Sequence, residues 1–481
     1  RSDLLFYFLG GGIKFGLKTK GVGMYKLFSI IFCLLAILEV TVCAPVVDQM
    51  EGRVGGKRTL VMVDAMKTED THSMFLETLK DRGHQITVAT AESNDLRLIA
   101  FGAPLYDNII LLCPEWEEGG SVKVDDVMGL VEGGANLMVF GDVRMGGATR
   151  RVAARAGADF DKEGTQVVDH FSWAEGLGGA APHTVVRVGP AGVLRNAWVL
   201  GPAAAAGELP PVLYRGLGHA VDAQNILAQV ALAGGPTTYS AALDAEIESY
   251  PENAGRDTAL VSAVQARNNA RVSVAGSATL CSNRYQLAPG AGNAAFCAAL
   301  SAWALGERGV LRARGVMHHR ADGSAPELLL KEKERADLPP SLFADPEITR
   351  NSLVYRVNDD VAYSFAVEVY NGEKWEPFNT DDLQIEFVML DPYIRKTMTN
   401  DGQGGYSTTL KTPDVYGVFK FHVLYRRPGL SVINFDTQVS VRPFKHDEYE
   451  RFIPAAFPYY AGAFSTMAGF FVFSLFFLYS K

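Results

Sequence analysis

Over residues 58–156, short apolar runs alternate with stretches whose apolar residues recur every three or four positions. The runs predict buried strands, and the recurring stretches predict amphipathic helices. The expected strands are 59–64, 85–90, 108–112 and 136–140, and the expected helices are 68–83, 121–132 and 149–156. Because strands that alternate with helices form a parallel sheet covered on both faces, we expect a flavodoxin-like α/β domain.

The rest of this domain is less regular. Residues 176–207 are rich in Ala, Gly and Pro with little periodicity, which indicates a loose surface insertion. Regularity returns with expected strands at 211–215 and within 259–277, and with an expected helix at 294–305. We therefore assign residues 45–326 to one α/β domain that carries an irregular insertion.

The next part of the chain has a different period. Apolar and polar residues alternate at 361–369, 383–387 and 419–425, and Asn371-Gly372 between them is a hairpin turn signal. Short strands of this kind predict an antiparallel β-sandwich of immunoglobulin-like size. The expected boundaries are a charged linker at 327–350, the sandwich at 351–445 and a juxtamembrane segment at 446–458.

A run without charged side chains follows at residues 459–480. As an α-helix, a run of this length reaches about 30 Å, the thickness of the apolar core of a bilayer. Phe457, Tyr459 and Tyr460 form an aromatic belt where this run begins, as is typical of membrane interfaces. We expect a single transmembrane helix.

Ala461, Ser465 and Gly469 recur every four residues and place small side chains on one face of the expected helix. Such a stripe lets a second helix approach closely, so we expect this face to pack against another membrane helix. The alternative is a helix that serves only as an anchor.

The amino-terminal part reads as a targeting segment. Residues 1–23 precede Met24 and look like an upstream extension. Lys26 and the apolar run 27–42 then resemble a secretory signal peptide that ends near Ala44. A cleaved signal and one carboxy-terminal span predict a type I membrane protein whose bulk is lumenal.

Composition limits the classes of function. The net charge is −9, from 45 basic and 54 acidic residues without a basic stripe, which argues against nucleic-acid binding. Beyond the signal peptide, Cys113, Cys281 and Cys297 allow at most one intramolecular disulfide, and the pairing stays open. The sequence has no Asn-x-Ser/Thr glycosylation acceptor of its own.

Two features of the α/β domain lie where catalytic or binding groups could be. Cys113 follows an expected strand, but Pro114, Glu115 and Trp116 after it do not suit a nucleophile elbow, and acidic neighbours disfavour a thiolate. The loop 141–147 lies where a phosphate-binding turn would, but it lacks the residues of a P-loop or a dinucleotide fingerprint. A structural cysteine and a simple turn are the better interpretations.

The remaining candidates are also better explained without catalysis. His318 and His319 face opposite sides of a strand, and His422 is expected on the polar face of one. The other candidates are a half catalytic pair, Asp169-His170, and an acidic loop with Glu115, Glu117 and Glu118. Since no nucleophile, base and oxyanion donor come together, we predict no catalytic residues, no metal site and no cofactor.

Several segments resemble the family of 48-kDa subunits of the eukaryotic oligosaccharyltransferase. They are 58–114 (RTLVMVDAMKTEDTH…), 264–277 (VQARNNARVSVAGS), 309–320 (GVLRARGVMHHR), 413–430 (PDVYGVFKFHVLYRRPGL) and 437–465 (TQVSVRPFKHDEYERFIPAAFPYYAGAFS). The resemblance runs in order from Arg58 to Lys481. It departs around 190–207, around 282–293 and before Met24.

The resemblance implies a non-catalytic scaffold or assembly subunit in the endoplasmic-reticulum membrane. Its complex transfers a preassembled glycan from dolichyl diphosphate to Asn of Asn-x-Ser/Thr sequons in nascent proteins. In that family the catalytic membrane subunit is a different chain, and the α/β domain resembles class I glutamine amidotransferases without their catalytic residues. The expected partners are the other subunits and the membrane, while a contact with glycan or nascent polypeptide stays open.

Two other classes remain as alternatives. One is a membrane-anchored, amidotransferase-like thiol hydrolase that uses Cys113. The other is a cell-surface adhesion or receptor protein built on the membrane-proximal sandwich.

Overall fold

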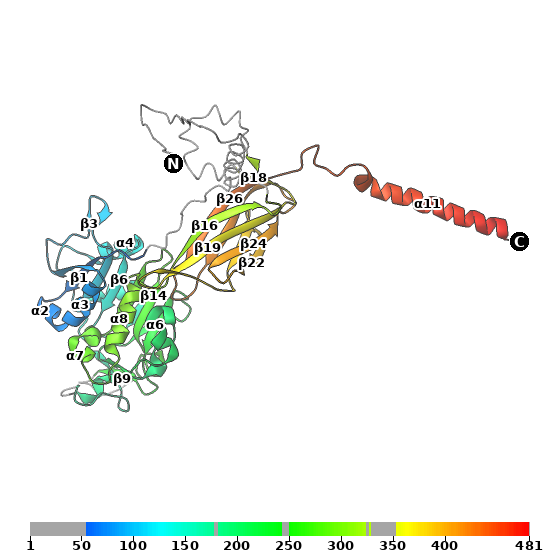
Figure 1. Cartoon of the computed structure of the whole chain (residues 1–481). Coiled ribbons are helices and arrows are strands. Elements are labelled where there is room, and N and C mark those ends of the chain that lie inside the picture. The colour runs from blue at the N-terminus through cyan, green and yellow to red at the C-terminus, as the bar shows by residue number, and fades with distance from the viewer. Residues whose placement is uncertain (1–53, 178–180, 243–249, 324–326, 329–352, 481) are drawn as a thin grey trace, which may run out of the picture.

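The computed structural model of the chain describes residues 54–177, 181–242, 250–323, 327–328 and 353–480. The expected extension and signal peptide, and most of the expected linker, lie outside these residues. The described chain forms an α/β region (54–309), a β region (310–448) and a carboxy-terminal helix (Figure 1).

A nine-stranded mixed sheet is the centre of the α/β region. Its strands are β1 (Arg58–Val63), β2 (Gln85–Thr90), β5 (Asn108–Leu112), β6 (Asn136–Phe140), β7 (Ala158–Phe160), β11 (His219–Val221), β12 (Ala228–Ala233), β14 (Ala259–Gln265) and β15 (Arg271–Ala275). Their order is β2-β1-β5-β6-β15-β14-β11-β7, with β12 also paired to β14. The first five strands in this order run parallel, and the others pair antiparallel. The strands expected between residues 59 and 140 are confirmed within one residue.

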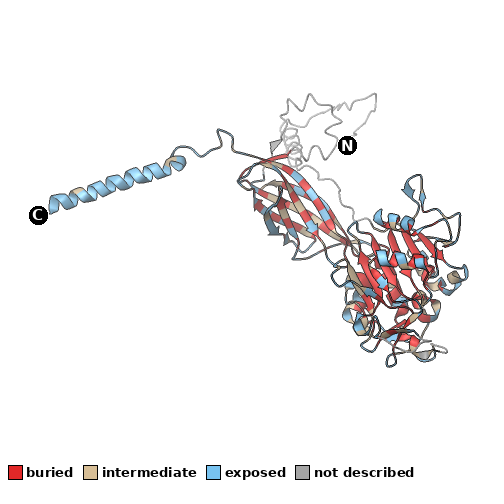
Figure 2. Ribbon diagram, turned by 180° about the vertical axis from the view of Figure 1, so that it is seen from behind, coloured by how far each residue is buried: buried red, intermediate tan, exposed pale blue. Residues whose placement is uncertain are grey.

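Helices cover both faces of this sheet, as the sequence pattern predicted. On one face α4 (Val124–Glu132) and α5 (Gly147–Arg155) share an apolar cluster with Leu60 and Ile109. On the other face α3 (Ser73–Asp81), α6 (Ala197–Ala206) and α8 (Asn293–Ala304) share one with Val61 and Ile110. Because neighbouring strand residues point to opposite faces, the central strands are buried on both sides (Figure 2).

Short elements complete the α/β region. Three further sheets have two strands each. They pair β3 (Ile99–Ala100) with β4 (Ala103–Pro104), β8 (Thr165–Val168) with β13 (Tyr239–Ala242), and β9 (Val186–Val188) with β10 (Val212–Tyr214). The short helices are α2 (Lys67–Thr71), α7 (Asn283–Gln286), η1 (Pro182–Thr184), η2 (Pro190–Gly192), η3 (Gly255–Asp257) and η4 (Ala278–Cys281).

The expectation of a loose insertion at 176–207 was wrong for its second half, which holds α6. The Asn196 side chain accepts a hydrogen bond from the Trp198 amide and so caps the helix. Val199, Leu200 and Ala204 are then buried against the sheet. The sequence pattern missed this helix because an Ala-rich segment shows no contrast between an apolar and a polar face.

Two expected helices begin differently from the prediction. The helix expected at 68–83 is divided into α2 and α3 at His72, and neither Thr68 nor Asp70 caps it. The His72 ring is held 2.8 Å from the carbonyl oxygen of Ala278, a contact distant in sequence. The helix expected at 121–132 begins at Val124, because the Ser121 hydroxyl donates to the Leu96 carbonyl instead.

The β region contains two sheets whose facing sides share one apolar core. The five-stranded sheet contains β16 (Val310–Arg320), β19 (Asp360–Tyr370), β20 (Trp375–Pro377), β23 (Thr399–Asn400) and β24 (Gly405–Lys411). The six-stranded sheet contains β17 (Glu327–Leu328), β18 (Leu353–Arg356), β21 (Gln384–Val388), β22 (Pro392–Thr397), β25 (Gly417–Tyr425) and β26 (Ile433–Arg442). All pairs are antiparallel except β18 with β26.

The assignment of residues 310–320 to the α/β domain is corrected by their pairing. β16 pairs with β19 over almost its whole length and so belongs to the β region. The expected linker also begins within a strand, because Glu327 and Leu328 pair with β18. The sequence pattern did not indicate this pairing, since only five residues separate β16 from α8 and the strand carries the polar residues Arg312, Arg314, His318 and His319.

The two regions meet at residues 428–432, which precede β26. The Trp303 indole donates to the Gly429 carbonyl at 2.9 Å, and the Gln265 amide donates to the Leu430 carbonyl at 2.7 Å. The buried Arg271 guanidinium donates to the carbonyls of Trp303 and Gly309 at 2.9 and 2.8 Å. A cavity of about 450 Å³ lies beside this junction. Residues of both regions line this cavity. Hydrogen bonds therefore join the two regions beside a space that the described side chains do not fill.

The end of the β region opposite this junction is called the distal end. It carries the turn 389–391, the loop 412–416 and Arg442, where β26 ends. The chain continues from here to α11 (Ile453–Tyr479), which extends away from both regions (Figure 1).

Glu448 fixes the connecting segment to the distal end. Its two carboxylate oxygens accept hydrogen bonds from Arg442 at 2.6 and 2.7 Å, and one of them accepts from the Lys445 amide at 2.7 Å. The bonds from Arg442 and from the Lys445 amide lower the pKa of Glu448 from 4.5 to about 2. Arg356 lies over the Phe444 ring at 5.2 Å and adds a second contact.

We predict that Glu448→Gln releases this segment, because the neutral amide cannot hold Arg442 through two charge-assisted bonds. Trypsin should cleave after Lys445 and Arg451 faster in the variant at neutral pH. Asp447→Asn is the control, since it removes the same charge one position away from the Arg442 pair. Equal cleavage rates in the two variants would contradict the prediction.

The same contact predicts a pH dependence. Because the pKa of Glu448 is lower in the folded chain, the contact stabilises the fold fully above about pH 4.5 and is lost as the pH falls through about 2. Hydrogen exchange at the Lys445 amide should therefore stay protected at pH 4. Loss of protection already at pH 4 would count against it.

Candidate functional site

The carboxyl edge of the parallel strands is where open α/β sheets bind ligands, at the point where the strand order reverses. Here that point lies between β1 and β5. Asp64 follows β1, Cys113 follows β5 and Asp142 follows β6, so the structure places the Cys113 of the thiol hypothesis at this edge together with two carboxylates.

Cys113 is fully buried at this edge. Burial, together with the negative charge of Asp64, raises the pKa of its thiol far above the ordinary value. The Cys113 carbonyl accepts a hydrogen bond from the Thr149 hydroxyl at 2.9 Å, which ties the loop to α5. The thiol is therefore held protonated in an apolar environment, which suits a structural role and not a nucleophile.

The acidic loop after Cys113 caps two helices. Glu117 accepts a hydrogen bond from the Gly147 amide at 2.7 Å, at the beginning of α5. Glu118 accepts from the Val124 amide at 2.8 Å, at the beginning of α4, and pairs with Arg151. A carboxylate is stabilised at a helix amino terminus, where unpaired N–H groups converge. Glu117 therefore occupies the Gly147 amide of the loop 141–147. In a phosphate-binding loop this amide would be free to bind the phosphate.

The histidine candidates have different surroundings and different partners. His318 is buried with its ring 2.7 Å from the Tyr355 hydroxyl, whereas His319 faces the other side of β16. His422 lies on the outer face of its sheet and pairs with Asp436, as the alternation predicted. Among the described residues no group of three or more His, Cys, Asp or Glu could hold a metal ion.

Asp169 and His170 point to different partners. The Asp169 carboxylate accepts hydrogen bonds from the Phe171 and Ser172 amides, and from Thr237 and Thr238. His170 instead lies 2.9 Å from the Tyr239 hydroxyl. Asp169 therefore orders a turn and does not orient an imidazole for catalysis.

The pairing of the cysteines, which the sequence left open, is resolved. Cys281 in η4 and Cys297 in α8 form a disulfide with a Cα–Cα distance of 5.9 Å. It joins the segment after β15 to the helix that covers the sheet.

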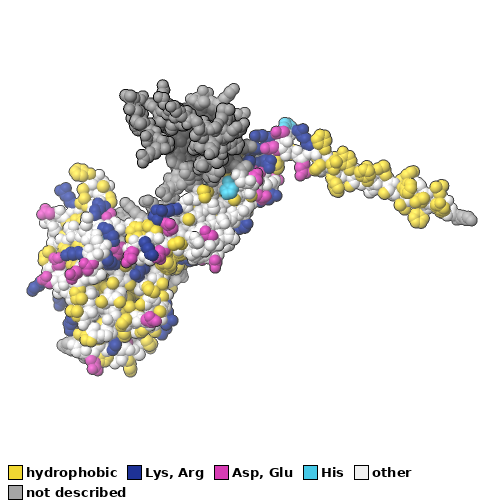
Figure 3. All heavy atoms as spheres, in the orientation of Figure 1, with side chains coloured by type: hydrophobic (Ala, Val, Ile, Leu, Met, Phe, Trp, Pro, Cys, Tyr) yellow, Lys and Arg dark blue, Asp and Glu magenta, His cyan; other side chains and the backbone are white. Residues whose placement is uncertain are grey.

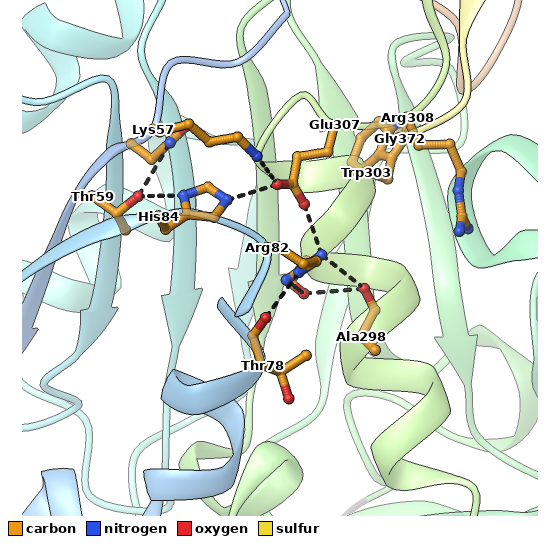
Figure 4. A network of polar contacts seen from close by, with 12 residues as sticks. Lys57, Thr59, Thr78, Arg82, His84, Ala298, Trp303, Glu307, Arg308 and Gly372 are labelled. Carbon is orange, nitrogen blue, oxygen red and sulfur yellow. Dashed lines mark hydrogen bonds and ion pairs between the residues drawn. The ribbon is translucent and has the colours of Figure 1, made fainter. Parts of the chain in front are cut away.

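A polar site that sequence reasoning missed lies at the amino edge of the same strands (Figure 4). The Glu307 carboxylate, 4% exposed as a residue, pairs with Lys57, with Arg82 at 2.8 Å and with His84 at 2.8 Å. Burial alone would raise the pKa of Glu307, but the hydrogen bonds from His84 and Lys57 and the charge of Arg82 outweigh it, so the pKa is lowered.

Hydrogen bonds continue from this site along the strand ends. The His84 ring is 2.8 Å from the Thr59 hydroxyl, which accepts from Asn108. Asn136 donates to Asn108, and the Arg271 amide donates to Asn136. We call this series from Glu307 to Arg271 the polar chain. The sequence signal was a polar residue at the first position of β5, β6 and β15, before each apolar run.

The carboxy-terminal helix carries the other predicted site residues. α11 begins at Ile453 and not at the expected Tyr459, with Pro454 in its first turn, where a missing N–H costs nothing. It is the one helix of the described chain that is long and apolar enough to cross a membrane. Its large apolar side chains are exposed (Figure 3).

Ala461, Ser465 and Gly469 lie along one side of α11 at the spacing of four that the sequence predicted, and no described segment covers them. Phe457, Tyr459 and Tyr460 lie within its first eight residues and are exposed. These six residues share one helix, which is consistent with a packing stripe below an aromatic belt.

Comparison with known families agrees with this architecture. The family model described as OST48, N-terminal domain, matches residues 51–307, and the OST48 middle domain matches residues 344–481.

This chain belongs to the OST48 family.

Three relatives of this OST48 chain carry the name dolichyl-diphosphooligosaccharide–protein glycosyltransferase 48 kDa subunit. The protein of Danio rerio is 38% identical over 90% of this chain and 94% of its own length. The protein of Drosophila melanogaster is 36% identical over 93% of this chain and 95% of its own length. The protein of Arabidopsis thaliana is 35% identical over 88% of this chain and 93% of its own length. The resemblance read from the sequence is confirmed.

We predict that Glu307→Gln destabilises the α/β region by about 3 kcal/mol, because it leaves Arg82 and Lys57 near a buried group without charge. Chemical denaturation of the chain in detergent measures the loss. Glu252→Gln is the control, since Glu252 pairs with Lys162 at the surface and its loss should leave the free energy of unfolding nearly unchanged. If both variants lowered the free energy of unfolding by a similarly small amount, the stability of the polar chain would not depend on the Glu307 charge.

Proposed function

We propose that this chain is a non-catalytic scaffold and assembly subunit of the oligosaccharyltransferase complex of the endoplasmic-reticulum membrane. That complex transfers a preassembled glycan from dolichyl diphosphate to Asn of Asn-x-Ser/Thr sequons in nascent proteins. The observation that carries the proposal is the match to the 48 kDa subunits over about nine tenths of the chain.

The proposed topology is type I and single-pass, with both folded regions in the lumen. α11 supports the single span because it is long and apolar enough to cross a membrane and is separate from the folded regions. The proposed orientation rests on the expected signal peptide. The proposed partners are the other subunits, including the catalytic membrane subunit, and the small-residue stripe at Ala461, Ser465 and Gly469 is the proposed contact in the membrane.

The finer fold assignment is also a proposal. The five parallel strands follow the order 2-1-3-4-5 when numbered along the chain, which is the flavodoxin-like order. The two sheets of the β region share one core between them, which supports a β-sandwich.

A non-catalytic role is supported by the carboxyl edge of the sheet. There the Cys113 thiol is buried with a raised pKa, and Glu117 and Glu118 occupy the amino termini of the neighbouring helices. The thiol-hydrolase alternative needs an exposed thiolate at this place, which these contacts disfavour.

A mild-detergent pull-down of the tagged chain tests the proposal, with transfer of glycan to a sequon peptide as the assay. We predict that transferase activity co-purifies with the chain, and that Cys113→Ser recovers the same activity because the thiol takes no part in transfer. Loss of activity in Cys113→Ser, with the complex intact, would favour the thiol-enzyme alternative. Recovery of the chain alone at the cell surface would favour a receptor.

We predict that Gly469→Leu lowers recovery of the other subunits while the lumenal fold is retained, because a large side chain prevents close helix contact. Quantitative immunoblotting of the pull-down measures it. Ser474→Leu is the control, since it introduces the same side chain about 140° away around the helix. Equal recovery with both variants would remove the stripe from the proposal.

A further inference from the structure

The β region exposes its large apolar side chains mainly at one end. Among its described residues these are Met317, Leu390, Tyr393, Val415, Tyr416, Val418 and Leu424. All except Met317 and Leu424 lie in or beside the turn 389–391 and the loop 412–416 of the distal end. Leu390 is 90% exposed and Tyr416 is 68% exposed. We call Leu390, Tyr393, Tyr416 and Val418 the distal patch.

Strand pairing places the distal patch beside the exit of the chain toward the membrane helix. Gly417 pairs with Val441 and Val418 with Ser440, at the last residues of β26. Val388, just before the turn with Leu390, pairs with Lys420 of the same strand β25. The patch and Arg442 therefore share one end of one sheet.

The connection from this end to the membrane helix is short. Glu448 is held by Arg442 at the end of β26, and α11 begins five residues later at Ile453. Five fully extended residues reach at most about 17 Å. The start of α11 consequently cannot lie far from the distal patch, whatever the direction of the helix.

Apart from Leu424, the rest of the outer face of the same sheet is polar. Lys420 and His422 pair with Asp436, and Glu386 pairs with Arg395. An exposed apolar group confined to one end of a polar face marks a contact surface. Its composition, two tyrosines with a leucine and a valine, suits the boundary between lipid headgroups and acyl chains, where amphipathic rings are favoured.

We propose that the distal patch docks on the lumenal surface of the bilayer and inserts Leu390 and Tyr416 among the lipids. This inference rests on the proposed span of α11. It assigns the β region a second membrane contact. Two contacts with the membrane would fix the tilt of both folded regions, which a single span alone does not.

Site-directed fluorescence on the full chain tests this docking. Leu390→Cys is labelled with a polarity-sensitive probe, and the chain is reconstituted in phosphatidylcholine vesicles with or without a lipid that carries a quencher near the headgroup. Leu424→Cys is the matched control, since Leu424 is an exposed leucine on the same sheet, six residues from Val418 along β25, or about 20 Å. The wild-type chain gives the background from its own cysteines.

We expect the probe at 390 to shift its emission to shorter wavelength and to lose intensity with the quencher lipid, and the probe at 424 to do neither. Tyr416→Asp added to Leu390→Cys should weaken the quenching, because a carboxylate is costly to bury among lipids. Its near-ultraviolet circular dichroism should match that of Leu390→Cys alone if the fold is kept.

Equal signals from positions 390 and 424 would overturn the docking. So would shielding of position 390 that occurs only in the assembled complex and not in lipid alone, since the patch would then contact a protein partner. Flotation of the chain with the vesicles separates the two proposals. A chain that floats without quenching at 390 keeps its membrane span but loses the docking, whereas a chain that does not float loses both.

Discussion

The polar chain at the amino edge of the parallel strands is the constraint on which the α/β region depends. Parallel strands begin at the same edge, so their first backbone groups and first side chains crowd there together. Thr59, Asn108 and Asn136 are buried, and each side chain is hydrogen-bonded to a neighbouring strand or to the segment just before one. A change of register in one strand would leave several buried polar groups unpaired, at a cost of about 1–3 kcal/mol each.

The direction of these bonds also follows from the contacts. The Glu307 carboxylate can only accept, so the Nε2 atom of His84 carries a proton. The Nδ1 atom of the same ring lies 2.8 Å from the Thr59 hydroxyl, which accepts from Asn108. Because Glu307 follows α8, the series joins the helix layer to the strands, and Arg271 extends it to the β region through the carbonyls of Trp303 and Gly309.

The regular elements could be predicted because they satisfy local rules. The central strands of the sheet are apolar after their first residue, and in β25 buried residues alternate with more exposed ones. The spacing of apolar residues along the sequence is therefore enough to locate these strands. α6 was missed since its stability comes from burial of Val199 and Leu200, not from amphipathic contrast. β16 was assigned to the wrong region because pairing with β19, about fifty residues later along the chain, decides its place.

Sequence patterns located some residues of the candidate sites and missed others. The position of Ala461, Ser465 and Gly469 on one side of α11 could be predicted because helical periodicity fixes it, whereas their contact with a second helix stays a proposal. Glu117 and Glu118 could not, because the helices that they cap begin several residues later and the acids look like an ordinary exposed loop in the sequence. The polar chain joins residues up to 250 positions apart, such as Lys57 and Glu307, and no local pattern reports such a distance.

The two edges of the parallel sheet therefore differ from those of a ligand-binding α/β protein, in which the carboxyl edge holds the ligand. The carboxyl edge, where ligands bind in such folds, is closed by carboxylates that pair with the helix amides and by a buried thiol. The amino edge carries the buried charges and connects to the β region, which continues to the membrane helix. The polar contacts at both edges hold segments of the chain together: Glu117 and Glu118 join the carboxyl edge to two helices, and Arg271 joins the α/β region to the start of the β region. That is the property an assembly subunit requires.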